Sequence, residues 1–404
     1  MLASEESVEW SARRPGSRSA PRPPLPFRQF ILKIASRCNL SCDYCYMYEL
    51  ADDSWRGQPK RMSTATIKIT ADRIAEHAAA HELTDVQVIL HGGEPLLAGP
   101  GSIGSIATTL RAATPARVDL RVQTNGTLLS DAMLDTLTRH DIKVGVSLDG
   151  AAGDNDRHRH YANGHGSHAD VARSLRRLRA SAAQLFAGII CTIDLGHDPI
   201  RTYDAIREFA PPLIDFQLPH GNWTTPPPGR DPGTTDAPYG SWLATVFDHW
   251  YGASPGGPGV RMFSEIIHLV LGGQSRVETV GLAPVAFIVV NTDGALEQVD
   301  ALRSAFNGAA GTGLSVHTNG FDAALIHPEI VARQLGADGL SPTCRECALH
   351  RVCGGGLYAH RYRSGTGFAN PSVYCHDLAY LIRHIHRQVS GDVARLAAQS
   401  KGPA

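Results

Sequence analysis

The fold is decided by one stretch near the start of the chain, Phe30-Ile31-Leu32-Lys33-Ile34-Ala35-Ser36-Arg37-Cys38-Asn39-Leu40-Ser41-Cys42-Asp43-Tyr44-Cys45. Its first part, Phe30–Ala35, is a largely apolar run that predicts a β-strand. Three cysteines follow, with the spacing C-x₃-C-x₂-C. Because α/β barrels carry their chemistry at the carboxyl ends of the strands, we expect the three thiols to lie in a functional site.

The three thiolates of Cys38, Cys42 and Cys45 can bind three irons of a 4Fe–4S cluster. A closed electron-transfer cluster takes four protein ligands. The spacing therefore predicts a cluster whose fourth iron is open to a substrate or cofactor. The alternative is a zinc site that awaits a fourth ligand, because closely spaced cysteines also occur in zinc sites.

The composition is that of a globular protein. The chain has 404 residues, of which 43% are apolar and 19% charged, and its formal net charge is −1. This balance gives no electrostatic reason to expect nucleic acid as a partner. No apolar run approaches the length of about 20 residues that spans a membrane. We therefore expect a cytoplasmic protein that binds no membrane, and whose eight cysteines serve as metal ligands rather than disulfides.

Strand-like and helix-like runs alternate from Arg28 to about Pro219. Amphipathic runs such as Thr64–His81 and His168–Ala180 predict helices. This alternation predicts an α/β fold with six β/α units and a parallel sheet. The expected strands are Phe30–Ala35, Val86–Leu90, Val118–Gln123, Lys143–Ser147, Gly188–Ile193 and Ile214–Leu218.

A polar or glycine motif stands at or after each of several strand ends. Taken alone, Asn-Gly and Asp-Gly indicate only turns. The ordered set, together with the cysteine loop, resembles the radical S-adenosylmethionine (radical SAM) enzymes, whose core is a six-unit (β/α) partial TIM barrel. The motifs are His91-Gly92-Gly93-Glu94-Pro95-Leu96, Thr124-Asn125-Gly126-Thr127, Ser147-Leu148-Asp149-Gly150 and Asp156-Arg157-His158-Arg159.

The resemblance implies a binding mode for SAM. SAM would chelate the open iron, and one electron from the cluster would cleave it to a 5′-deoxyadenosyl radical. Gly92, Gly93 and Glu94 would receive its amino group, and Arg159, in preference to Arg157, would pair with its carboxylate. The other implied contacts are Tyr44, Ile193 and Leu218 near the adenine, Ser147 and Asp149 at the ribose, and Asn125 at the third strand end.

Four more cysteines occur in the last third of the chain. Four thiolates suit either zinc or a 4Fe–4S cluster. Their spacing, C-x₂-C-x₅-C with a distant fourth cysteine, resembles the SPASM extension of radical SAM enzymes that modify peptides, and implies an auxiliary 4Fe–4S cluster. The remaining cysteine, Cys191, lies inside an expected strand and is interpreted as a small buried apolar residue. The four expected ligands are Cys344, Cys347, Cys353 and Cys375.

The C-terminal region departs from a full SPASM domain, which holds two auxiliary clusters. Leu357 stands where that domain has a further cysteine, and Glu297-Gln298-Val299-Asp300 follows the expected hairpin Thr292–Leu296 where another belongs. The ligands of one auxiliary cluster are thus missing as a set, so we expect two clusters in total. Asp300 falls where related maturases carry a carboxylate that serves as base; the alternative is a solvated turn residue.

The motifs resemble the FxsB-type radical SAM/SPASM proteins over nearly all of the chain after about Phe27. The similarity is carried by His91–Gly99, Cys353–Tyr362 and Pro371–Cys375. It implies a maturase of a ribosomally made precursor peptide that takes a Cβ hydrogen and forms a carbon–carbon crosslink (a cyclophane) to an aromatic side chain. The alternatives are thioether formation, β-hydroxylation, formylglycine formation, or a non-catalytic iron–sulfur binding or regulatory protein.

The expected partners are the precursor peptide and a one-electron donor such as flavodoxin or ferredoxin, and the expected state is a monomer. The predicted organisation is a disordered or loosely packed tail (1–27), the radical SAM partial barrel (28–220), a linker with bridging helices (221–285), a SPASM-like auxiliary-cluster domain (286–390) and a C-terminal tail (391–404). The run Ser241–Leu271 is expected to be helical, with its aromatic residues in the core.

Overall fold

The computed structural model describes residues 24–253 and 256–399. Most of the expected N-terminal tail and the last residues of the C-terminal tail therefore lie outside the described residues. Phe27 is fully buried, and the backbone N–H of Leu25 donates to the side chain of Gln334 at 2.9 Å. The packed chain thus begins before residue 28.

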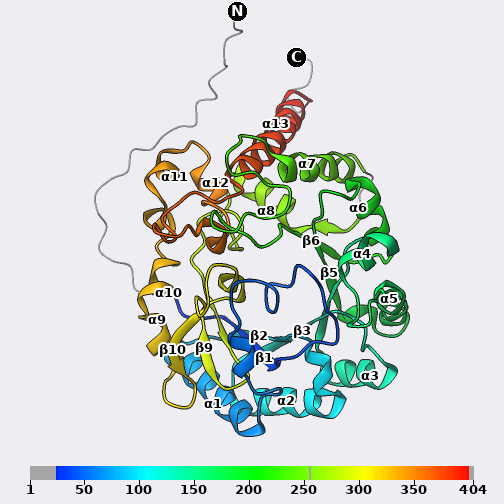
Figure 1. The fold of residues 1–404 in the computed structure, drawn as a ribbon, viewed down its shortest axis with the longest axis vertical. Coiled ribbons are helices and arrows are strands. Elements are labelled where there is room, and N and C mark those ends of the chain that lie inside the picture. The colour runs from blue at the N-terminus through cyan, green and yellow to red at the C-terminus, as the bar shows by residue number, and fades with distance from the viewer. Residues whose placement is uncertain (1–23, 254–255, 400–404) are drawn as a thin grey trace, which may run out of the picture.

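A single curved sheet organises the described chain (Figure 1). Within the described residues it has ten strands in the order β10-β9-β8-β1-β2-β3-β4-β5-β6-β7, and it does not close. β1 to β7 run parallel, β8 is parallel to β1, and β9 is antiparallel to both β8 and β10. The strands are β1 (Gln29–Ala35), β2 (Asp85–Gly92), β3 (Arg117–Thr124), β4 (Lys143–Ser147), β5 (Phe186–Thr192), β6 (Leu213–Gln217), β7 (Gly259–Val260), β8 (Phe287–Val290), β9 (Ala295–Glu297) and β10 (Gly311–Ser315).

Helices that connect the parallel strands lie around the outside of the curve (Figure 1). Several begin at a capping side chain: Ser63, Ser130 and Asp198 each accept a backbone N–H of the first turn. The six predicted strands and the α/β fold class are confirmed. The helices are α1 (Thr64–Ala80), α2 (Pro100–Ala113), α3 (Asp131–Arg139), α4 (Ala152–His158), α5 (His168–Ala182) and α6 (Pro199–Arg207).

The last third adds further helices and short 3₁₀ turns. The run Ser241–Leu271, expected to be helical, contains parts of two helices, which a run rich in Gly and Pro separates. The helices are α7 (Pro238–Tyr251), α8 (Arg261–Val270), α9 (Phe321–Leu325), α10 (Pro328–Ala332), α11 (Pro342–Glu346), α12 (His350–Cys353) and α13 (Cys375–Gln399). The 3₁₀ turns are η1 (Ser54–Gly57), η2 (Pro95–Ala98), η3 (Ala183–Leu185), η4 (Asp300–Ser304), η5 (Gly336–Gly339) and η6 (Tyr358–Arg361).

The main apolar core crosses the predicted domain boundaries. It includes Phe30 on β1, Phe216 on β6, Phe247 on α7 and Leu381 on α13, all fully buried. The sheet likewise passes from β1 to β8 across residue 286. The division into domains stays a prediction, but the two expected halves share one core and one sheet. Among the described helices, none combines the length and the apolar character needed to cross a membrane.

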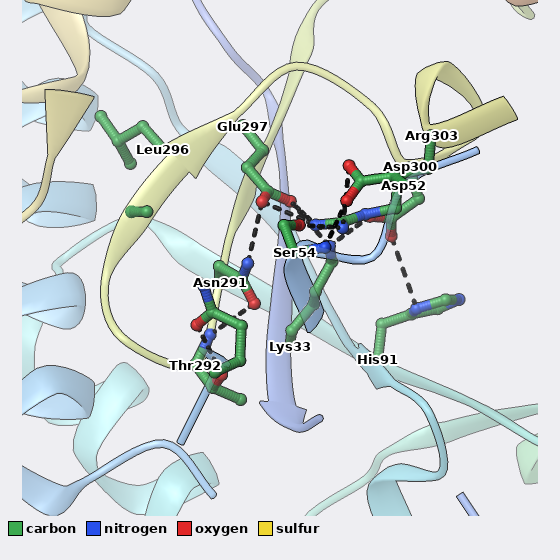
Figure 2. A network of polar contacts seen from close by, with 12 residues as sticks. Lys33, Asp52, Ser54, His91, Asn291, Thr292, Leu296, Glu297, Asp300 and Arg303 are labelled. Carbon is green, nitrogen blue, oxygen red and sulfur yellow. Dashed lines mark hydrogen bonds and ion pairs between the residues drawn. The ribbon is translucent and has the colours of Figure 1, made fainter. Parts of the chain in front are cut away.

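A buried network of charges ties β1 to the segment after β9 (Figure 2). Lys33 on β1 donates to Glu297 at 2.7 Å and also contacts Asp300. Arg303 on η4 reaches both oxygens of Glu297, at 2.7 and 2.8 Å, and Asp52 at 3.3 Å. Since desolvated charges are costly unless they are paired, these contacts fix the C-terminal segment against the first strand.

Removal of Arg303 should therefore destabilise the fold strongly. Arg303→Leu leaves Asp52, Glu297 and Asp300 with Lys33 as their buried cation. Breaking a buried pair in this way costs about 3–5 kcal/mol. We expect the free energy of unfolding in urea, followed by fluorescence, to fall by that amount.

Lys68→Ala provides the control, because it removes an exposed pair with Asp72 one turn along α1. That change should cost less than about 1 kcal/mol. Equal losses in the two variants would contradict a stabilising role for the network.

Candidate functional site

A cavity of about 900 Å³ lies at the carboxyl ends of the strands, inside the curve of the sheet. Its walls come from the cysteine loop after β1, from the ends of β2 to β6, and from the expected linker, which contributes Thr225 and Pro226. Most residues that the sequence suggested for the SAM site meet on these walls. They are Cys38, Cys42, Tyr44, Cys45, Gly92, Gly93, Asn125, Ser147, Asp149, Arg159, Ile193 and Leu218.

The three thiols of the loop lie close enough to influence one another. Burial, together with the nearby thiol of Cys38, raises the pKa of Cys42 to about 11 and that of Cys45 to about 12. The sulfur of Cys38 accepts from the backbone N–H of Leu40 at 3.4 Å and from the amide of Asn125 at 3.7 Å. Three adjacent thiolates in such a place need a cationic partner, and a metal ion or cluster displaces their protons. The donor set therefore fits an iron–sulfur cluster.

A polar triad joins the cysteine loop to the fourth strand end. Tyr44 donates its hydroxyl hydrogen to Asp149, and Nη1 of Arg159 donates to the Tyr44 hydroxyl at 2.8 Å. Arg159 is buried, and its Nε has no hydrogen-bond partner among the described residues. A buried guanidinium N–H on a cavity wall needs an acceptor. The carboxylate of SAM fits that need.

Arg159 is a better candidate than Arg157 for this role. Arg157 also lines the cavity, but its side chain is 59% exposed and lies 3.3 Å from Asp194. The hydroxyl of Ser147 accepts from Gln123 at 3.1 Å, while Ile193 and Leu218 present buried apolar surface to the cavity. The assignment of each residue to a part of SAM stays a prediction.

Glu94 differs from the expectation. It is fully buried and is not among the residues that line the cavity. Its carboxylate accepts from the hydroxyl of Thr124 at 2.7 Å, from the backbone N–H of Asn125 at 2.7 Å and from that of Leu96 at 2.9 Å. Glu94 thus holds the second and third strand ends together, so its contribution to the site is positional.

Glycine is required at position 92 for a structural reason that the motif does not indicate. Its φ is +139°, and a Cβ placed on it would lie 2.0 Å from the carbonyl oxygen of Ala35. Only glycine permits this approach between the ends of β1 and β2. Gly92 therefore lies on the cavity wall, as expected, and also packs against the backbone that leads into the cysteine loop.

The four C-terminal cysteines converge on one place. Cys344 lies in α11, Cys353 ends α12 and Cys375 begins α13, with Cys347 just after α11. Burial, together with the thiols of Cys375, Cys344 and Cys347, raises the pKa of Cys353 to about 12. The four sulfurs therefore interact electrostatically, as ligands of one cluster or metal would.

The positions of the missing cluster ligands also lie together. Leu357 packs against Ala301 and Leu302 in a small apolar cluster that is separate from the main core. η4, which begins at Asp300, contacts η6, which follows Leu357. Apolar packing and the ion network thus fill the region in which the sequence indicated a lost cluster.

Asp300, the predicted base, stands behind the cavity wall. Its Oδ1 contacts Lys33 and lies 3.4 Å from Nε of Arg303, whereas its Oδ2 faces Nδ1 of His91 at 4.0 Å. Burial alone would raise the pKa of Asp300, but Lys33 and Arg303 hold it below its usual value. The alternative of a solvated turn residue is wrong, because Asp300 is buried and ion-paired. The role as base stays a prediction.

Two histidines of the cavity were not predicted as site residues from the sequence. His91 and His220 both line the cavity, and Nδ1 of each is buried without a hydrogen-bond partner among the described residues. Burial lowers the pKa of both, to about 4 for His220, so both imidazoles are neutral at pH 7. Their position at or just after a strand end was the available signal.

Comparison with known proteins agrees with this site. The model of the radical SAM superfamily matches residues 32–199. The serine-type anaerobic sulfatase-maturating enzyme of Bacteroides thetaiotaomicron is 25% identical over 271 residues, which is 63% of this chain and 64% of that protein. The cysteine-type enzyme of Clostridium perfringens is 23% identical over 286 residues, 68% of this chain and 74% of that protein.

Solved structures show the same fold. The structure of anSMEcpe with bound AdoMet (SAM) has a TM-score of 0.76 and 18% identity, and covers 91% of this chain and 99% of that one. SuiB of Streptococcus suis, bound to its precursor peptide SuiA, has a TM-score of 0.59 and 13% identity, with 87% and 76% covered.

The chain spans 64%, 48% and 54% of the length of three serine-type relatives, so their activity is not transferred with the match. The matched residues 32–199 include the three-cysteine loop and most of the strand-end motifs that line the cavity. This part of the chain is accordingly similar to the radical SAM superfamily, and its relatives indicate an enzyme.

Proposed function

We propose that this enzyme removes a Cβ hydrogen atom from a residue of a peptide or protein substrate and oxidises that residue by two electrons. The observation that carries the proposal is the open cavity of about 900 Å³, which holds the three-thiol loop and is lined by His91 and His220, whose Nδ1 atoms have no hydrogen-bond partner among the described residues. Small-molecule sites measure about 300–1,000 Å³, so this cavity has room for SAM and a short substrate segment.

When bound, the SAM-ligated cluster supplies the deoxyadenosyl radical that takes the hydrogen atom, and a cluster at the C-terminal cysteines accepts one electron. The chain positions the reactants: Arg159 and Tyr44 orient SAM, and the strand ends held by Glu94 keep the cysteine loop in place. The cavity walls exclude water from the reacting carbon.

The proton released in this oxidation has a path on the cavity wall. His91 lies between the cavity and Oδ2 of Asp300, the carboxylate oxygen that faces away from Lys33. We propose that the proton moves to this oxygen by way of His91. The ion pairs of Asp300 keep the carboxylate ionised, so that Oδ2 is present as an acceptor, and they also lower its basicity.

The FxsB-type resemblance favours a carbon–carbon crosslink as the product. In this case the Cβ of one residue bonds to the aromatic ring of a nearby residue of a precursor peptide. The apparent loss of one auxiliary cluster, whose place is packed with Leu357 and Ala301, supports a specialised enzyme of this kind. A flavodoxin or ferredoxin as electron donor and a monomeric state remain part of the proposal.

A second candidate is oxidation of serine or cysteine to formylglycine. It is favoured by the relatives, whose names describe serine-type and cysteine-type anaerobic sulfatase-maturating enzymes. Serine oxidation removes two hydrogens, as the crosslink does, but it leaves an aldehyde.

Mass spectrometry distinguishes these outcomes. We expect the reduced enzyme with SAM to release 5′-deoxyadenosine and to lower the mass of a co-expressed precursor peptide by two hydrogens. A product that does not react with a hydrazide and gives a bridged fragment pattern supports the crosslink. A hydrazide-reactive product from a serine-containing sulfatase peptide supports formylglycine. Absence of 5′-deoxyadenosine would contradict the proposal in both forms.

Asp300→Asn tests the proton path. The amide cannot take the proton, so we expect peptide product to fall by at least about tenfold while 5′-deoxyadenosine is still released. His91→Gln, which keeps a polar side chain at the wall, should show the same separation. Full product formation by Asp300→Asn would exclude this role.

The number of clusters follows from the two cysteine sets. Reconstituted enzyme should bind about eight irons per chain, four in each 4Fe–4S cluster. Cys38→Ala, Cys42→Ala and Cys45→Ala should each abolish SAM cleavage and leave about four irons at the C-terminal site. About twelve irons in the unmodified chain would contradict the two-cluster assignment.

A further inference from the structure

Two histidines and an aspartate meet on the outer face of the sheet, away from the cavity. His77 lies in the last turn of α1, His81 is the residue that follows this helix, and Asp322 is the second residue of α9. Oδ1 of Asp322 lies 2.5 Å from Nδ1 of His77 and 2.9 Å from Nε2 of His81. None of the three lines the cavity. The cluster thus joins segments that are more than 240 residues apart.

The geometry of this cluster is close to that of a metal site. One ligand atom from each of the three residues lies within 4.8 Å of the other two. Zinc bonds of about 2.0–2.2 Å in a tetrahedral site place neighbouring ligand atoms about 3.3 Å apart. A small outward movement of the exposed side chains would therefore admit an ion.

One ligand is rigid and two are accessible. The side chain of His77 is 1% exposed, and its ring packs against Phe27, Phe30 and Phe321. His81 is 28% exposed and Asp322 is 54% exposed. Solvent can therefore deliver an ion and complete its coordination, while the buried ring holds one ligand nitrogen in place.

The charges also suit a cation. Burial lowers the pKa of His77, which keeps its imidazole neutral at pH 7, and hydrogen bonds from His81 and His77 hold the pKa of Asp322 below its usual value. Arg73, one turn before His77, is engaged by Glu76 and by the carbonyl oxygen of Val316. Two imidazoles and a carboxylate are a common ligand set for zinc and related ions.

The second ring nitrogen of His77 suits the tautomer that metal binding at Nδ1 requires. Nε2 of His77 is buried and has no hydrogen-bond partner among the described residues. The backbone of Phe27 lies close to this ring. It raises the pKa of His77, as a hydrogen-bond acceptor does. An ion on Nδ1 would place the ring hydrogen on Nε2, where a histidine ligand usually donates to a carbonyl or carboxylate.

We propose that His77, His81 and Asp322 form a binding site for a divalent transition-metal ion of the zinc type, which links α1 to α9. The site is distinct from both cysteine sets. It would fasten the outer layer of the barrel to the segment that follows β10, and so act on the stability of the fold.

Zinc binding to the full, cluster-loaded chain tests the proposal. The protein is incubated anaerobically with zinc chloride and desalted. Zinc and iron are then counted by mass spectrometry, and the midpoint of thermal unfolding is recorded with and without zinc. The variants are His81→Ala and Asp322→Asn, whose side chains face solvent. Asp72→Asn, an exposed carboxylate on the same helix, is the matched control.

We expect the unmodified chain and Asp72→Asn to retain about one zinc more per chain than the two variants, with unchanged iron. Zinc should raise the unfolding midpoint of the first pair and leave that of the two variants unchanged. Equal zinc content in all four proteins would overturn the proposal. A gain of zinc matched by a loss of iron would also overturn it, because the ion would then occupy the cysteines.

Discussion

The rest of the structure depends on the burial of one charge. Lys33 sits inside β1 with its side chain 1% exposed, and an ammonium group in that position must be compensated within the protein. Its partners, Glu297 and Asp300, come from the far end of the chain. Because breaking a buried pair costs several kcal/mol, the first strand and the segment after β9 are obliged to fold together. The shared sheet, in which β8 pairs with β1, is the geometric consequence.

The same charge network also lies next to the wall of the cavity, through Asp300 and His91. The network contains three carboxylates, those of Asp52, Glu297 and Asp300, and two cations, Lys33 and Arg303. With His91 neutral, the group carries an excess negative charge, and the oxygen of Asp300 that faces His91 is the part nearest the cavity wall. An arrangement that stabilises the fold therefore also leaves a negative potential where a proton would be released. Structural and chemical roles are combined in the same five side chains.

Much of the fold, and the meeting of most candidate residues at one cavity, could be predicted from the sequence because the signals are local. The six strands carry apolar runs, and the motifs follow at their carboxyl ends, so Arg159, Asp149 and Tyr44 were found before their contacts were known. Contacts between residues that are far apart in the sequence could not be predicted in this way. Nothing near Lys33 identifies Glu297, which stands 264 residues away, although a lysine within an apolar strand was itself a signal. Glu94 is a similar case: a carboxylate in a glycine motif suggests contact with a ligand, whereas its oxygens accept from Thr124, from the backbone N–H of Asn125 and from that of Leu96.

The two cysteine sets and the packed region near Leu357 follow one electrostatic rule. Thiols that are buried together resist ionisation, as the raised pKa values of Cys45 and Cys353 show. A site of this kind is stable as a thiolate site only when metal is present. If cluster ligands are lost one at a time, the remaining buried thiols would stay without compensation. Loss of the whole set avoids that cost, and the space can then be filled by Ala301, Leu302 and Leu357, which need no counterion. The joint absence of cysteines at Leu357 and after the β8–β9 hairpin is therefore the pattern that this chemistry favours.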